Sequence, residues 1–72
     1  MTKKLQVLKF LEERSMVHPS EMVDYLFPTI GATRRYLSYL KQQRLVLNLD
    51  RMWYLTNEGY KRLYYLEDKE KI

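Results

Sequence analysis

The chain of 72 residues is long enough for one domain, over 1–72, and too short for a second. Hydrophobic residues make up 46% and charged residues 31% of it, a balance typical of a folded domain rather than a disordered tail. The absence of cysteine excludes disulfides, thiolate zinc sites and cysteine nucleophiles, and it favours a reducing, cytoplasmic location. No uncharged stretch reaches the ~18–20 residues of a membrane span, so we expect no membrane contact and no signal peptide.

The net charge of +4 is concentrated in the middle of the chain. Residues 31–51 contain five basic side chains and a single acidic one, Asp50, whereas the charges of the other segments cancel. A basic cluster of this kind indicates a partner that is a polyanion. The alternative interpretation is a solvated helix face with no binding role.

The first part of the chain is predicted to contain two helices separated by a short strand. Leucines at three-residue spacing predict a helix over 3–14, capped by the hydroxyl group of Thr2. A short strand is expected at 16–17. A second helix is expected to begin at Pro19, which suits a first turn, and to end before Pro28, which cannot continue a helix.

A third helix is predicted over 33–43, and its outward side is the main candidate site. At about 100° per residue, one side of this helix is apolar and faces the core. The opposite side is polar, basic and aromatic, and it is formed by Arg35, Ser38, Tyr39 and Gln42, with Arg34 at its margin. Arginine can bind guanine edges or phosphate, glutamine can read adenine, and hydroxyl groups can bind phosphate oxygens. This side therefore suits a nucleic acid.

The last third of the chain is predicted to form a hairpin and a final helix. Two apolar runs, 45–49 and 52–55, flank a short polar turn that contains Arg51. Thr56 is the expected cap of the final helix, which we expect to fray after Glu67.

In chain order, these elements are a helix, a short strand, two helices, a hairpin and a helix. Two short helices joined by a tight turn form a helix-turn-helix, whose second helix enters the major groove, and a hairpin that follows it is called the wing. The predicted fold is therefore an α+β winged helix-turn-helix. The candidate nucleic-acid-binding residues lie on the third helix, at the hairpin tip and at the N-terminus: Arg34, Arg35, Ser38, Tyr39, Lys41, Gln42, Arg51, Lys3 and Lys4.

The junction between the hairpin and the final helix resembles known families. Its sequence, YLTNEG from Tyr54 to Gly59, is similar to the strand-to-helix junction of winged-helix regulators of the PadR and MarR-like groups. It resembles more closely the N-terminal module shared by plectin and a eukaryotic small-subunit ribosomal protein. The resemblance extends weakly over 7–17 and 36–46, and it implies the winged-helix fold. One departure is Arg44, which stands where such proteins commonly have glycine and predicts a third helix that is longer by a residue or two.

The leading functional hypothesis is sequence-selective binding of double-stranded DNA by a small transcriptional regulator of archaeal or viral origin. A ribosome-associated or RNA-binding module is the alternative favoured by the resemblance, and a winged helix that docks another protein is a third. Enzymatic activity is not expected, because Glu12 and Glu13 point to different helix sides and no serine has a convincing base. His18 is the single histidine, so no metal site is predicted, and nothing indicates a cofactor or a small-molecule ligand.

Seven tyrosines are more than a small core needs. Surplus aromatic residues indicate a partner surface, and a homodimer with C2 symmetry through the final helix would suit a palindromic DNA site. The alternative is that these rings shield a thin core. The residues expected at the dimer or partner surface are Tyr60, Tyr64, Tyr65 and Leu66.

Overall fold

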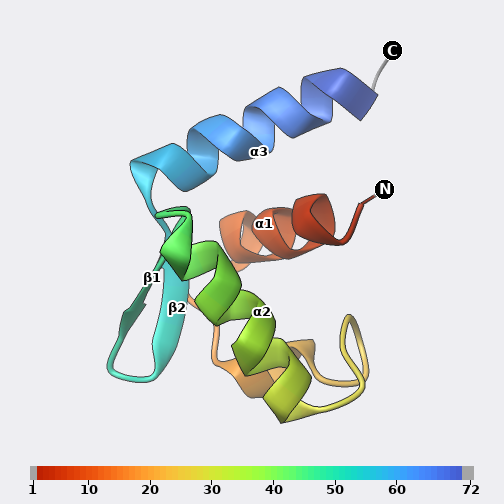
Figure 1. Cartoon of the computed structure of the whole chain (residues 1–72), viewed down its shortest axis with the longest axis vertical. Helices are drawn as coiled ribbons and strands as arrows, with labels where there is room; N and C mark the ends of the chain where they lie inside the picture. Colours follow the sequence, from red (N-terminus) through yellow and green to blue (C-terminus); the bar gives the residue numbers. More distant parts are fainter. Residues whose placement is uncertain (1, 71–72) are drawn as a thin grey trace.

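The computed structural model describes residues 2–70, in which three α-helices pack around one side of a two-stranded antiparallel hairpin (Figure 1). The helices are α1 (Lys3–Arg14), α2 (Ile30–Gln42) and α3 (Asn57–Glu70), and the strands are β1 (Val46–Leu49) and β2 (Met52–Leu55). The predicted α+β class is confirmed. Across residues 2–70, every helix is too short or too polar to cross a lipid bilayer.

Helix α1 has the bounds that its leucine spacing predicts. The Thr2 hydroxyl accepts a hydrogen bond from the Leu5 N–H at 3.2 Å, as expected of a cap. Leu5, Leu8 and Leu11 are almost fully buried and contribute to a core that α1 shares with α2, α3 and the hairpin. The apolar stripe of α1 therefore positions the other elements.

The prediction of a second helix over 19–27 is wrong. Only a short 3₁₀ helix, η1 (Pro19–Met22), forms there, capped by reciprocal hydrogen bonds between His18 and Glu21. The backbone then turns extended at Val23 and left-handed at Asp24, which has a φ of 68°, so an α-helix cannot continue. A turn over 23–27, closed by a bridge between Val23 and Phe27, buries Phe27 and leaves Val23 and Leu26 half-buried.

Helix α2 begins three residues earlier than expected, because Thr29 caps it by accepting from the Ala32 N–H at 3.1 Å. The helix ends at Gln42, so the extension predicted from Arg44 is wrong. Arg44 itself takes the left-handed conformation, with a φ of 64°. Its N–H donates to the Lys41 carbonyl and the Leu45 N–H donates to the Leu40 carbonyl. This is the Schellman termination that glycine usually provides.

The hairpin is closed by a two-residue turn in which both residues are left-handed. Asp50 and Arg51 have φ values of 51° and 69°, the pattern of a type I′ turn. The strand expected at 16–17 is reduced to one bridge, in which Val17 and Trp53 exchange two backbone hydrogen bonds of 2.9 and 2.8 Å. This bridge ties the end of α1 to β2.

Helix α3 begins as predicted with Thr56 as its cap, since the Gly59 N–H donates to the Thr56 hydroxyl at 3.0 Å. Gly59 packs directly on the chain that leaves α2: a Cβ placed there would lie 2.1 Å from the Leu45 carbonyl oxygen. The glycine of the YLTNEG sequence thus permits the close approach of α3. The helix continues to Glu70, beyond the point at which fraying was expected.

Candidate nucleic-acid interface

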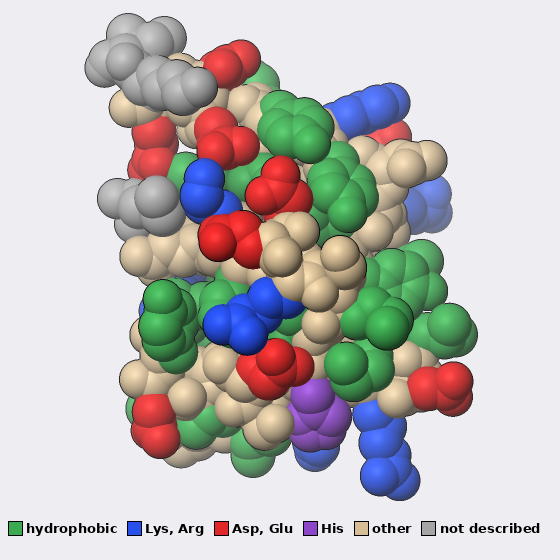
Figure 2. Space-filling model, turned by 180° about the vertical axis from the view of Figure 1, so that it is seen from behind, with side chains coloured by type: hydrophobic (Ala, Val, Ile, Leu, Met, Phe, Trp, Pro, Cys, Tyr) green, Lys and Arg blue, Asp and Glu red, His purple; other side chains and the backbone are tan. Residues whose placement is uncertain are grey.

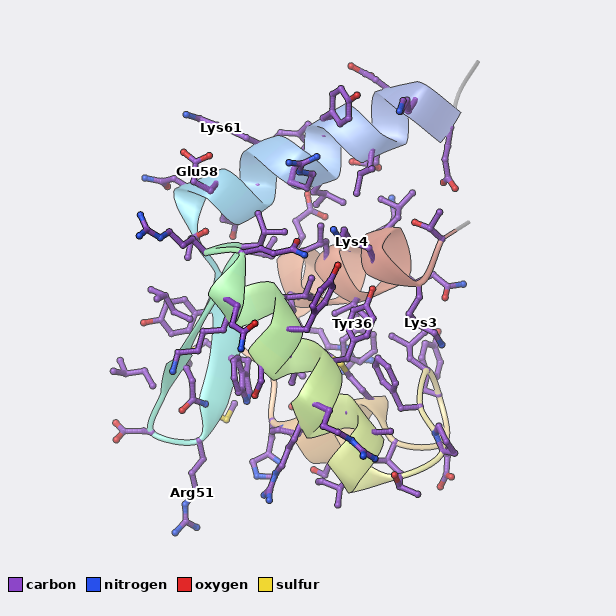
Figure 3. The ribbon with its side chains drawn as sticks, in the orientation of Figure 1. Lys3, Lys4, Tyr36, Arg51, Glu58 and Lys61 are labelled. Atoms are coloured by element: carbon purple, nitrogen blue, oxygen red, sulfur yellow. The ribbon has the colours of Figure 1, made fainter. Side chains whose placement is uncertain are left out.

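A hollow of about 260 Å³ lies between α2 and the hairpin, and we call it the α2–hairpin hollow. Arg34 and Ser38, one turn apart on α2, line one side of it, and Asn48 and Arg51 of the hairpin line the other. Its remaining walls are His18, Pro19 and Trp53. Figure 3 shows Arg51 at the hairpin tip, directed away from the body of the protein. The hollow brings together three predicted site residues from two elements, Arg34 and Ser38 of α2 and Arg51 of the hairpin.

The arginines of this region have no acidic partner among residues 2–70. The salt bridges between described residues join Lys9 to Glu67, Arg14 to Glu21 and Lys61 to Glu58. None of them involves α2 or the hairpin. Arg34, Arg35 and Arg51 are all exposed, so their guanidinium groups can bind an external anion without first breaking an internal ion pair.

The outward residues of α2 divide between two flanks. Arg35, Ser38, Tyr39, Lys41 and Gln42 are exposed, as predicted. Ser38 lies on the flank that faces the hairpin, together with Arg34. Tyr39 lies on the other flank, where its ring is 5.8 Å from that of Tyr36. The helical wheel had placed Arg34 at the margin, but the position of the hairpin makes it a wall of the hollow.

Lys3 and Lys4 lie on the α1 side of this surface, where both contact the body of the protein (Figure 3). The Lys3 ammonium group donates to the Leu26 carbonyl and lies 4.9 Å from the centre of the Phe27 ring. The Lys4 ammonium group donates to the Gln43 side chain at 3.0 Å and lies 5.6 Å from the Tyr39 ring. Lys4 and Tyr39 thus form a joint basic and aromatic edge.

Tyr36 supports this aromatic edge as a neutral phenol. Burial raises the pKa of Tyr36 above its ordinary value of 10.0, and the neighbouring Tyr39 raises it further. The phenol therefore stays protonated at neutral pH, and it adds no negative charge beside a surface that is to meet a polyanion.

The charges of the molecule are distributed unevenly between its faces. Helix α2 contains three basic residues and no acidic one. Figure 2 shows the molecule from behind, where acidic side chains gather over the part formed by α1 and α3. The excess of positive charge on α2 would therefore attract a polyanion to its side of the molecule.

The residues expected at a partner surface on α3 do not form one patch. Tyr60 and Leu66 are half-buried against the core, whereas Tyr64 and Tyr65 are 53% and 52% exposed. The Tyr64 ring lies 6.5 Å from that of Tyr60. Tyr65 lies instead between two cations, Arg62 at 5.7 Å and Lys69 at 5.5 Å. Successive helix residues point about 100° apart, so the two exposed tyrosines belong to different flanks of α3.

Four residues of the α2–hairpin hollow were not identified as site residues from the sequence: His18, Pro19, Asn48 and Trp53. The strand register could have found Asn48, because it pairs with Trp53 and so shares the inner face of the hairpin. His18 caps η1 and is one of the residues that line the hollow. Among residues 2–70, no three histidine or carboxylate side chains converge as a metal site requires.

Comparison with known proteins assigns no function to this site. No protein-family model, curated protein or solved structure matches the chain. The features that bear on function are therefore those of the molecule itself: the α2–hairpin hollow, the arginines that lack acidic partners, and the exposed tyrosines of α3.

Proposed function

We propose that this protein is a winged helix-turn-helix protein that binds double-stranded DNA, with α2 as the helix in the major groove and the β1–β2 hairpin as the wing. The observation that carries this proposal is the α2–hairpin hollow, which Arg34 and Arg51 line from opposite sides. Both are exposed, and neither has an ion pair within residues 2–70. In this arrangement η1 takes the place of the first helix of the helix-turn-helix.

Within this arrangement, the residues of α2 have distinct roles. The major groove is about 12 Å wide and admits one helix. Arg35 and Gln42 lie farthest from the buried side of α2 and would reach base edges. Arg34, Ser38 and Arg51 border the hollow and would bind phosphate oxygens of the adjacent backbone.

Alanine substitution of the two hollow arginines tests the proposal. The R34A/R51A double variant should bind a labelled random-sequence duplex at least tenfold more weakly than the wild type, because two charge-assisted contacts are lost. The R14A/K69A variant removes the same charge from positions outside the hollow and is the matched control. Equal affinity of the R34A/R51A variant and the wild type would show that this surface is not the binding site.

Binding to RNA is the second candidate, and the Lys4–Tyr39 edge favours it, because exposed aromatic residues next to cations can stack unpaired bases. We rank it below DNA, because the deep, narrow major groove of A-form RNA does not admit a helix such as α2. Competition between duplex DNA and a structured RNA separates the two. Stronger competition by the RNA would reverse the ranking.

We further propose that two copies pair through the Tyr60–Tyr64 flank of α3. These rings contact each other at 6.5 Å, and Tyr64 remains half exposed at the surface. A C2 dimer buries such a flank against its own copy and presents two α2 helices to a palindromic site.

A winged helix that docks an unrelated protein would instead show no salt-sensitive binding to DNA.

A further inference from the structure

A second basic hollow, of about 660 Å³, lies where the chain leaves α2 and enters α3, and we call it the α2–α3 hollow. Its polar lining is formed by Gln43, Arg44, Glu58, Lys61, Arg62 and Tyr65. Three of these side chains are cationic and one is anionic. Glu58, the single carboxylate of the hollow, is paired with Lys61 at 3.6 Å. Arg44 and Arg62 form no salt bridge with any carboxylate among residues 2–70.

We propose that the α2–α3 hollow binds a backbone phosphate of the same DNA that α2 contacts, and this inference rests on the proposed function. Its polar side chains match the chemistry of a phosphate oxygen: two guanidinium groups, an ammonium group and a phenol. The Arg62 guanidinium group lies 5.7 Å from the centre of the Tyr65 ring, and both side chains line the hollow.

The backbone conformation of Arg44 supports a role for its side chain. Arg44 occupies the left-handed position of the Schellman termination, where glycine is the more stable residue. The only other left-handed arginine within residues 2–70 is Arg51, which lines the α2–hairpin hollow. Each hollow is thus lined by an arginine with a left-handed backbone conformation, which is less stable for arginine than for glycine. A guanidinium group that binds a ligand explains why arginine stands at both.

The distance between the two hollows fits a single DNA groove. Arg34 and the last residue of α2, Gln42, are eight residues apart, which corresponds to about 12 Å along the helix, and Arg44 follows this helix end. This length is close to the ~12 Å width of the major groove. Figure 3 shows Lys61 at the end of the molecule where α3 begins and Arg51 at the opposite end, beyond the hairpin turn. With α2 in the groove, the two hollows would meet the two backbones that border it.

The R44G variant tests this inference, because the substitution removes the charge while it relieves the left-handed strain. We expect a higher midpoint of urea unfolding, an affinity for a random-sequence duplex that falls roughly five- to tenfold, and a salt slope that falls by about one. R44K, which retains a cation, should recover most of the affinity, and R62A should weaken binding without stabilising the fold.

The outcomes distinguish this inference from the proposed function. If R44G and R62A bind the duplex with the affinity and salt slope of the wild type while R34A/R51A binds weakly, the α2–α3 hollow is not a contact and this inference alone is overturned. If the wild type shows no salt-dependent binding to any duplex, the proposed function fails and this inference fails with it.

Discussion

Arg34 on α2 and Arg51 at the tip of the hairpin line the same hollow from opposite sides, although they are distant in the sequence. Both guanidinium groups are exposed, and neither is neutralised by a carboxylate within residues 2–70. Two like charges that border one open hollow form an arrangement that an anion between them would stabilise. This relationship is the basis of the predictions about binding.

Replacement of Arg51 by glycine should separate stability from binding. The substitution creates an Asp-Gly pair in a type I′ turn, which is a favoured sequence for that turn. We expect the free energy of unfolding to rise by about 1 kcal/mol, because a left-handed arginine is replaced by a residue without a Cβ. The affinity for duplex DNA should fall roughly tenfold. Urea unfolding and fluorescence anisotropy measure the two effects, and a variant that is both more stable and unimpaired in binding would remove Arg51 from the site.

The two glycines should respond oppositely to alanine. At Gly59 a Cβ would lie 2.1 Å from the Leu45 carbonyl oxygen, so α3 must shift, and we expect a loss of about 2–3 kcal/mol or failure to fold. At Gly31 the nearest atom outside the local backbone is 3.9 Å away, and alanine should stabilise α2 by about 0.5–1 kcal/mol. Thermal unfolding monitored by circular dichroism measures both. A well-tolerated G59A variant would contradict the close approach of α3 to the end of α2.

The ion pair between α1 and α3 should make stability depend on alkaline pH. The hydrogen bond and charge of Glu67, 3.0 Å away, raise the pKa of the Lys9 ammonium group above its ordinary value of 10.5. A raised pKa in the folded state means that the contribution is complete below pH 10.5 and is lost as the pH rises through the folded-state value. The difference in unfolding free energy between the wild type and E67Q should therefore shrink above that pH. A difference that is constant across this range would show that the pair does not stabilise the fold.

If two copies pair through the Tyr60–Tyr64 flank of α3, the measured molecular mass should depend on protein concentration. Light scattering should show a wild-type dimer, and Y64E should be a monomer, because a carboxylate at the centre of the pair would be buried without a partner. Y65E, on the other flank, is the matched control and should remain a dimer. If Y64E has the same mass as the wild type at every concentration, the copies do not pair through Tyr64.

The elements with a strong local signal could be predicted from the sequence, and those fixed by tertiary contacts could not. Leucine spacing and Thr2 determine α1 almost completely, and the apolar runs with the turn at Asp50 determine the hairpin. The segment 19–27 carries apolar residues that either a helix or a turn can bury, and only the left-handed Asp24 decides between them. The predicted end of α2 was wrong at Arg44, because a non-glycine residue took the left-handed position.

The candidate site could be predicted as a set of residues but not as an arrangement. Periodicity identified the exposed residues of α2, since it depends only on which side is buried. Which flank faces the hairpin depends on how β1 packs against α2, and no local pattern encodes this packing. This packing decides that Arg34, and not Arg35, lines the hollow. It also brings Asn48 into the hollow.

The most direct test of the central claim is the affinity of the wild-type protein for a random-sequence DNA duplex as a function of salt concentration. Each phosphate neutralised by a basic side chain adds about 0.9 to the slope of log affinity against log salt. The three phosphate contacts proposed for the two hollows predict a linear decrease with a slope of about −3. A flat dependence, or no measurable binding at low salt, would contradict the claim that this surface binds DNA.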